Sequence, residues 1–227
     1  MVKAMGLVIN VERWDMAAAI SIATEGIRAK YNADSGGGGF GAADREIGAK
    51  LDGAKVLAVI DQMEITAQHL ADWCLFAYAS PLWNSTDNKT RFLETLMNDW
   101  AVLSLEQGTV IQKKTFERMA CLASVVAGAF ALEQIQGVSV INTDRGLSYQ
   151  PKLTRSYLIH LLVEHDLKNA SESVRNSEFE SKRRRYYQTH WDVWHSNIEE
   201  MRSLLMNYDK SARFLFKKTL EKQNGSY

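Results

Sequence analysis

Proline is nearly absent from this chain, which contains only Pro81 and Pro151 among its 227 residues. Proline kinks or ends helices because its ring fixes φ and removes a backbone N–H. Residues that form helices readily fill most of the remaining sequence. The sequence therefore predicts an all-α fold: a multi-helical body, a C-terminal helix-turn-helix-like unit and a long terminal helix. The run VSVINTDRG at residues 138–146 is the one segment that indicates a strand or hairpin.

A glycine-rich stretch divides the N-terminal part. SGGGGFG at residues 35–41 lacks the lysine and hydroxyl that complete a phosphate-binding loop, so we interpret it as a flexible linker, with a ligand loop as the alternative. Residues 1–34 are then a semi-independent N-terminal helical arm. A helical body is predicted over residues 42–148. The helix-turn-helix-like basic region and the long helix are predicted over residues 149–227.

Three helices are expected in the body. The first covers residues 42–79, with breaks near Gly53 and around Met63. The second and third are expected to end at Gly108 and Gly137, because glycine readily adopts the left-handed conformation that closes many helices.

The charge is balanced overall but unevenly distributed. Lysine plus arginine and aspartate plus glutamate each number 27, so the net charge gives no reason to expect a polyanionic partner. Residues 51–100 carry three cations against seven anions, whereas residues 151–227 carry 14 cations against 10 anions. The basic part of the chain is its C-terminal region.

The sequence shows no sign of export or of a disulfide framework. Cys74 and Cys121 are too few for such a framework, and no basic start is followed by an apolar signal segment. The most apolar run, residues 119–132, is shorter than the roughly 20 residues that span a bilayer. We expect a buried core helix there, and a cytoplasmic protein of a bacterial host cell.

No motif predicts catalysis or metal binding. His160 and His165, like His190 and His195, are five residues apart, a helical step of about 140° that turns the two rings to different faces. Both cysteines lie in apolar helical patterns without an activating neighbour. We expect no cofactor, no metal and no enzymatic activity, with an unrecognised helical active site as the alternative.

The segment NSEFESKRRRYYQTHW at residues 176–191 favours nucleic-acid binding. A helix after Pro151, a short helix at 169–175, a turn at Asn176-Ser177 and a long helix from Glu178 to about Tyr208 follow the order of a helix-turn-helix. Such a unit reads base edges with the start of its second helix and holds phosphates with flanking cations. The candidate residues for contact with double-stranded DNA are Lys168, Arg175, Ser181, Lys182, Arg183, Arg184, Arg185 and Gln188. An RNA-binding surface and a solvated charged face are the alternatives.

The other faces of this helix are predicted to pack. Phe179 and either Tyr186 or Tyr187 should point inward and fix the helix. Farther along, apolar residues recur at alternating steps of four and three, which is typical of a coiled-coil seam. The seam would pack on the protein's own body or form a homodimer, through Tyr187, Trp191, Trp194, Ile198, Met201, Leu205 and Tyr208.

Two aromatic patterns carry a family resemblance: HLADWCLFAYASP at residues 69–81 and YYQTHWDVWHSNIEEMRSLLMNYDKSA at residues 186–212. In these patterns the chain resembles the Q-type late-gene antitermination regulators of phages and prophages, over about a third of its length. The resemblance implies a regulator that binds DNA beside a late promoter and acts with RNA polymerase at pauses and terminators. The zinc-containing branch of that group has paired cysteines that are missing here, so the likeness is to zinc-free helical members.

A different class of function also fits the sequence. A helical interaction protein, such as an assembly subunit or a phage-encoded inhibitor of a host complex, would bind no DNA. It would use the apolar seam and tryptophans such as Trp73, Trp83 and Trp100 as contacts, since exposed aromatic residues often anchor interfaces.

Overall fold

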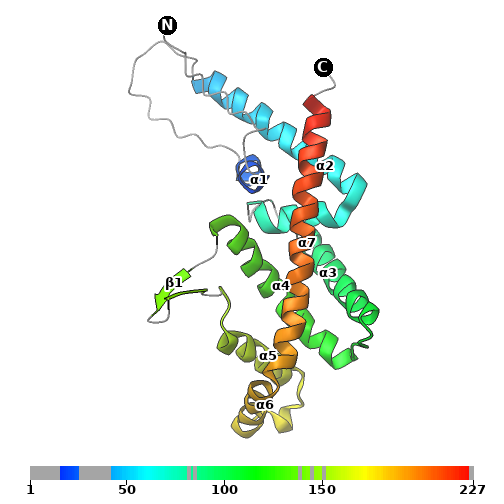
Figure 1. The fold of residues 1–227 in the computed structure, drawn as a ribbon, viewed down its shortest axis with the longest axis vertical. Helices are drawn as coiled ribbons and strands as arrows, with labels where there is room; N and C mark the ends of the chain where they lie inside the picture. The colour runs from blue at the N-terminus through cyan, green and yellow to red at the C-terminus, as the bar shows by residue number, and fades with distance from the viewer. Residues whose placement is uncertain are drawn as a thin grey trace. The chain divides into compact units, whose positions relative to one another are not determined.

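The computed structural model describes residues 16–25, 42–80, 83, 86–137, 140–143, 146–149 and 152–224, and in these ranges the all-α prediction is confirmed (Figure 1). A two-stranded antiparallel hairpin begins in the segment predicted for it. The elements are α1 (Met16–Glu25), α2 (Ala42–Tyr78), α3 (Thr86–Glu106), α4 (Lys113–Gln136), β1 (Val140–Thr143), β2 (Gly146–Tyr149), α5 (Arg155–Asn169), the 3-10 turn η2 (Glu172–Val174), α6 (Ser177–Thr189) and α7 (Trp191–Asn224).

The chain folds as two compact units. Unit 1 holds the residues up to Lys89 and those from Asp209 onward, and unit 2 holds Thr90–Tyr208. The chain therefore does not divide at residues 148 and 149, where the sequence placed a boundary. The reason is α7, whose first part belongs to unit 2 while its second part packs in unit 1. The predicted linker at residues 35–41 lies outside the described residues.

In unit 1, helix α1 packs on α2. Met16 and Ile20 are almost completely buried, and Sγ of Cys74 on α2 lies 3.8 Å from Sδ of Met16. The backbone N–H of Ser80 donates to Oγ1 of Thr24 at 2.8 Å. The described part of the predicted arm is therefore docked on the body and is not independent of it.

Helix α2 bends at Ala67, where φ is −155° and ψ is 76°, and not near Gly53 or Met63 as predicted. A single glycine costs a helix only about 1 kcal/mol relative to alanine. Gly53 lies close to α1, since a Cβ added there would be 3.7 Å from Cα of Ala23. At the other predicted break, Met63 is completely buried within the helical core. The helix ends at Tyr78, ahead of Pro81, as expected.

A buried carboxylate joins α2 to the second part of α7 within unit 1. Asp209 accepts hydrogen bonds from Nε1 of Trp73 at 3.2 Å, from Nε of Arg213 at 2.7 Å and from the hydroxyl of Tyr78. Burial and the bond to Asp209 raise the pKa of Tyr78. Asp209 is 4% exposed, so these donors replace the water that its charge would otherwise need.

In unit 2, helix α4 buries one face, with Met119, Val126 and Phe130 among its buried residues. This is the core helix that the apolar run predicted. Of the described helices, α4 alone also has the length and apolar composition of a membrane span. One of its carboxylates is engaged within unit 2: Oε2 of Glu133 accepts from Nη2 of Arg202 on α7 at 2.8 Å. Helices α3 and α4 are followed by Gly108 and Gly137, whose positive φ angles of 82° and 76° match the predicted helix ends.

The predicted long helix from Glu178 to Tyr208 is two helices. It breaks at His190, where φ is −103° and ψ is 25°, and α7 then continues to Asn224. The N–H of His190 still bonds to the carbonyl of Tyr186 at 3.0 Å, so the break costs one residue of helix. A one-residue break barely changes the spacing of apolar residues. The periodicity of the sequence therefore predicted one continuous helix.

The apolar seam is buried inside this single chain. All seven of its side chains are at most 8% exposed, so they pack on the protein's own helices. Within unit 2, Oγ of Ser104 on α3 bonds to Oε2 of Glu200 on α7 at 3.3 Å, and the hydroxyl of Tyr208 bonds to Asp99. These contacts fix the first part of α7 to α3.

Candidate nucleic-acid interface on helices α5 and α6

Side-chain caps determine where α5 and α6 begin. Oγ1 of Thr154 accepts from the N–H of Tyr157 at the start of α5. Oδ1 of Asn176 accepts from the N–H of Phe179 at 2.8 Å at the start of α6. Such caps satisfy N–H groups that a helix end leaves without a partner. The turn that the sequence placed at Asn176-Ser177 is therefore the capped start of α6.

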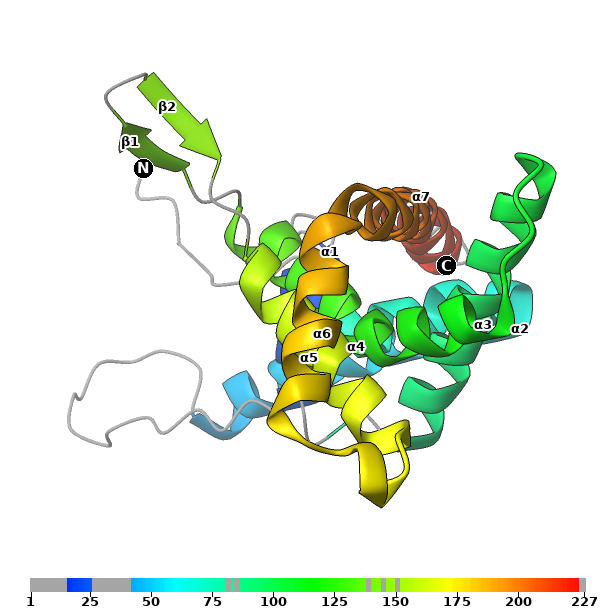
Figure 2. The ribbon, with the colours of Figure 1, turned by 90° about the horizontal axis from the view of Figure 1, so that it is seen from below.

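The connection between the two helices is compact but longer than in a common helix-turn-helix. Seven residues, 170–176, separate α5 from α6 and include the η2 turn, whereas three or four are usual. The guanidinium group of Arg175 donates to the carbonyls of Lys168 and Ala170, each at 2.9 Å. Arg175 therefore closes the C-terminal end of α5. Figures 1 and 2 show α6 lying next to α5.

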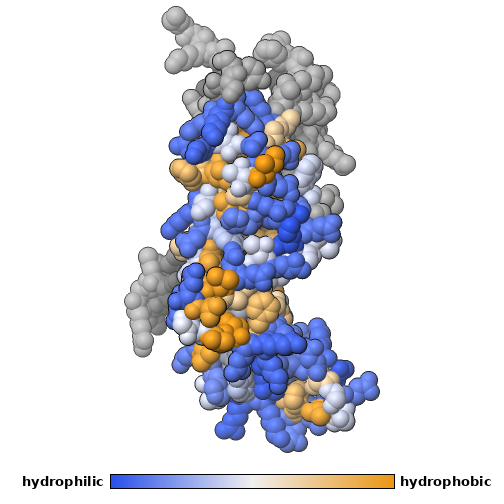
Figure 3. Space-filling model, turned by 90° about the vertical axis from the view of Figure 1, so that its right-hand side faces the viewer, coloured by the Kyte–Doolittle hydropathy of each residue, from blue (hydrophilic) through white to orange (hydrophobic). Residues whose placement is uncertain are grey.

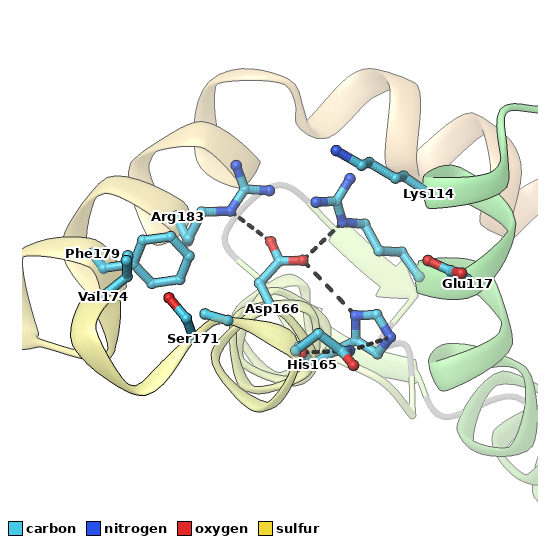
Figure 4. Close-up of a pocket in the computed structure, with 11 residues that line it drawn as sticks. Lys114, Glu117, His165, Asp166, Ser171, Val174, Phe179 and Arg183 are labelled. Atoms are coloured by element: carbon cyan, nitrogen blue, oxygen red, sulfur yellow. Dashed lines mark hydrogen bonds and ion pairs between the residues drawn. The ribbon is translucent and has the colours of Figure 1, made fainter.

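Asp166 on α5 joins three helices. Its Oδ1 accepts from Nε of Arg118 on α4 at 2.9 Å. Its Oδ2 accepts from Nε of Arg183 at 2.5 Å and from the hydroxyl of Tyr187 at 2.6 Å, both on α6. The Asp166 side chain is 7% exposed, and Figure 4 shows it and Arg183 pointing toward each other. We call these four residues the Asp166 cluster.

The protonation states in the Asp166 cluster follow from its contacts. Burial alone would raise the pKa of Asp166, but hydrogen bonds from Tyr187, Arg118 and Arg183 lower it. Burial and the bond to Asp166 raise the pKa of the Tyr187 hydroxyl. Asp166 is therefore a carboxylate at neutral pH, and Tyr187 is a neutral donor. The cluster holds the inward face of α6, formed by Phe179, Arg183 and Tyr187, against α5.

The opposite face of α6 is exposed. Steps of three and four residues bring side chains to the same side of a helix. On α6 this side consists of exposed residues, and four of them were predicted to bind DNA: Ser181, Lys182, Arg185 and Gln188. Arg184 is half-buried beside this face, and Lys168 is exposed in the last turn of α5.

Lys182 and Arg184 are each paired with an acidic residue one helical turn away. Nζ of Lys182 lies 2.7 Å from Oε1 of Glu178, and Nη2 of Arg184 lies 2.8 Å from Oε1 of Glu180. All four side chains are more than 40% exposed, so water screens these pairs and a phosphate can replace the glutamate. Arg185 forms no ion pair with any residue that the structure describes.

Two predicted residues have other roles in the structure. Nε and Nη2 of Arg183 donate to Asp166 and Tyr187, so its guanidinium group is turned into unit 2. Arg175 is engaged with the backbone at the end of α5. The outward contact set is therefore smaller than predicted: Lys168, Ser181, Lys182, Arg184, Arg185 and Gln188. Of the aromatic residues expected to fix the helix, Phe179 is half-buried and Tyr187 buried, while Tyr186 is exposed.

Sequence reasoning missed Asp166 and Arg118. One signal for Asp166 was available, since it follows Leu158, Ile159, Leu162 and Val163 at helical spacing and so occupies an apolar position of α5. A carboxylate at such a position requires buried partners. Nothing in the sequence indicated that Arg118, 48 residues earlier, would be one of them.

The described residues contain no group of three or more histidine, cysteine, aspartate or glutamate side chains that could hold a metal ion. His160 lies 3.5 Å from Glu164, while Nε2 of His165 lies 3.1 Å from the amide nitrogen of Asn169.

Comparison with known proteins gives no matching family model, and no curated protein or solved structure shows significant similarity to the chain.

Proposed function

We propose that this protein is a DNA-binding regulator of transcription that contacts duplex DNA through the outward face of α6 and the last turn of α5. The observation that carries the proposal is the division of α6 into two faces. Arg183 and Tyr187 lock one face onto Asp166. The other face presents exposed Lys182 and Arg185 to solvent.

The side chains on the outward face suit the two kinds of DNA contact. Lys182, Arg185 and Lys168 would hold phosphates, which position a protein on the duplex without reading sequence. Ser181 and Gln188 would face base edges, where glutamine suits adenine. Because the Asp166 cluster already fixes α6, binding would not have to order this helix, and the entropy cost of association is smaller.

The type of regulator follows from the resemblance of residues 69–81 and 186–212 to phage antiterminators. We include in the proposal that the protein acts in the bacterial cytoplasm, with RNA polymerase as its protein partner at a late promoter. Several aromatic residues of these segments, including Trp73, Tyr187 and Trp194, are buried. Their spacing therefore maintains the core of each unit, and the polymerase contacts would lie elsewhere on the helical body.

A salt series tests the DNA proposal. Fluorescence anisotropy of a labelled duplex, measured from 50 to 200 mM salt, gives the slope of log affinity against log salt. Each phosphate contact contributes a slope of about −0.9 on duplex DNA. The double variant Lys182→Ala/Arg185→Ala should bind more weakly, with a slope shallower by about 2 than that of the wild type.

The matched control is Lys113→Ala. Lys113 is 89% exposed at the start of α4, outside the proposed surface, so its loss should leave both affinity and slope unchanged. Equal affinities of the wild type and the double variant would refute the proposed surface. Binding of single-stranded RNA in place of duplex DNA would assign the surface to RNA.

A second candidate function is suggested by exposed apolar side chains. Val102, Leu105 and Val110, on α3 and just after it, are 54%, 61% and 77% exposed. Figure 3 shows apolar side chains gathered among hydrophilic ones on the side that carries α3 in Figure 1. Such patches mark protein contacts, as expected of a helical interaction protein. If the protein has that function, affinity purification should yield a stoichiometric protein partner, and the Leu105→Asp variant should no longer bind it. The protein should then have no affinity for duplex DNA.

A further inference from the structure

Unit 2 contains a cavity that the proposed DNA surface does not use. It has a volume of about 520 Å³ and lies between the start of α4, the end of α5, the connection at residues 170–176 and the start of α6. Small-molecule sites in proteins usually measure about 300–1,000 Å³. The cavity is open to solvent, and three members of the Asp166 cluster, Asp166, Arg118 and Arg183, form part of its wall.

The wall of this cavity carries more positive than negative groups. Three permanent cations line it, Lys114, Arg118 and Arg183, against two carboxylates, Glu117 and Asp166. Asp166 already accepts three hydrogen bonds, from both arginines and from a tyrosine, and its side chain is 7% exposed. It therefore orients the two guanidinium groups and does not compete for a ligand's donors.

Several donors on this wall are not used by the protein. A guanidinium group has five N–H bonds, and Arg118 uses only Nε among its contacts with described residues. Lys114 forms no ion pair with any described residue. Nδ1 of His165 is buried and lies 3.8 Å from Oδ1 of Asp166, the pair drawn in Figure 4, so the open donors are those of Arg118 and Lys114. Donors left open in a concave site indicate a ligand that accepts hydrogen bonds.

The cavity also has an apolar side. Val174 and Phe179 line it, and Figure 4 shows both on one side of Asp166, with Lys114 and Glu117 on the other. An aromatic ring such as that of Phe179 can pack against a flat or aliphatic group. A ligand that fills the cavity would therefore have an anionic end toward Lys114 and an apolar end toward Phe179.

From this arrangement we infer that the cavity is a binding site for a small organic anion: a phosphate or carboxylate group attached to a ring of about nucleoside size. The ligand would bridge α4, the α5–α6 connection and α6. The site does not depend on the DNA-binding proposal, because every group that recognises the ligand faces the cavity, and the outward face of α6 is on the other side of that helix.

Isothermal titration of the full chain with three probes, in the absence of DNA, tests the inference. Adenosine monophosphate has both the anion and the ring, inorganic phosphate has only the anion, and adenosine has only the ring. Adenosine monophosphate should bind most tightly of the three. Citrate or another ringless anion that binds equally tightly would contradict the role of Phe179 and Val174.

Two variants with opposite expected effects on the affinity make the test specific. Lys114→Gln should weaken binding of adenosine monophosphate about tenfold, because one charge-assisted hydrogen bond is lost. Glu117→Gln removes a negative charge from the wall and should strengthen binding. Lys210→Gln, an exposed lysine of unit 1, is the matched control and should change nothing. Both substituted positions are exposed, so the fold should be retained, which circular dichroism checks.

The outcomes separate clearly. No binding of adenosine monophosphate at millimolar concentration, or equal affinities of Lys114→Gln and the wild type, would overturn the inference. Binding that is retained while the Lys182→Ala/Arg185→Ala variant shows no defect with DNA would support the ligand site and refute the DNA proposal alone.

Discussion

Oδ2 of Asp166 on α5 accepts a hydrogen bond from Nε of Arg183 on α6 at 2.5 Å, across 17 residues of sequence. Because of this bond, the run of four cations at residues 182–185 does not act as one charged surface. Arg183 faces inward, Lys182 and Arg185 face outward, and Arg184 lies between. These four residues thus both attach α6 to α5 and give α6 an exposed positive charge.

Replacing Asp166 tests how strongly the cluster holds unit 2 together. Asp166→Asn keeps the shape of the side chain but leaves Arg118 and Arg183 without a counter-charge in a poorly accessible site. Removing one partner of a buried ion pair usually costs about 3–5 kcal/mol. Since both arginines are about 20% exposed, we expect a loss near the lower end, about 3 kcal/mol. Urea unfolding followed by circular dichroism measures it.

The control for this measurement is Asp61→Asn, at an exposed position of α2. Surface substitutions of this kind usually change the free energy of unfolding by less than about 0.5 kcal/mol. If Asp166→Asn were no more damaging than Asp61→Asn, the cluster would not be what holds α6 in place.

The same carboxylate predicts a pH dependence. Hydrogen bonds from Tyr187, Arg118 and Arg183 lower the pKa of Asp166 in spite of its burial. A lowered pKa means that the unfolded chain binds the proton more readily. The stability that Asp166 contributes is therefore complete above the unfolded pKa of about 3.9 and is lost as the pH falls through the lower folded value.

Unfolding measured from pH 6 to pH 2 should show this loss in the wild type. In Asp166→Asn the decline over the same range should be shallower, because one of the groups responsible is gone. Identical slopes for the two proteins would mean that other carboxylates account for the acid sensitivity.

Much of the fold could be predicted because it depends on local signals. Two prolines and continuous helical periodicity indicated an all-α chain, and Gly108 and Gly137 marked helix ends that the structure places nearby. The hairpin appeared where the sequence first favoured strands. These features are determined by residues within a few positions of one another.

What could not be predicted depends on contacts distant in sequence. The division into units follows from α7 supplying residues to both, and no local pattern shows where a long helix packs. The inward turn of Arg183 requires Asp166, and Arg118 reaches the same carboxylate from α4. The kink at Ala67 and the break at His190 left the apolar spacing almost unchanged, so the pattern did not reveal them.

The two cysteines should be poor nucleophiles. Burial raises the pKa of both thiols, and that of Cys121 to about 11. Only the thiolate reacts with alkylating agents. At pH 7.5 iodoacetamide should therefore modify Cys121 far more slowly than free glutathione, and the rate should rise as the pH approaches 11.

Cys74 is completely buried and should be modified only after unfolding in urea. Peptide mapping by mass spectrometry distinguishes the two sites. A thiol that reacts at pH 7.5 as fast as glutathione would mean an activated cysteine, which would revive the possibility of an enzyme.

Arg183 and Arg185 allow a comparison within one turn of α6. Arg183→Ala removes a partner of Asp166 and should lower the free energy of unfolding by about 3 kcal/mol, because a buried carboxylate loses a hydrogen-bonded cation. Arg185 is exposed and has no ion pair with a described residue, so Arg185→Ala should cost less than about 0.5 kcal/mol.

For binding to duplex DNA, Arg185→Ala alone should make the slope of log affinity against log salt shallower by about 0.9. Arg183→Ala, measured at a temperature where it is still folded, should keep the wild-type slope, since its guanidinium group faces Asp166. The reverse pattern, in which Arg183 changes the slope and Arg185 changes the stability, would show that α6 presents its other face to DNA.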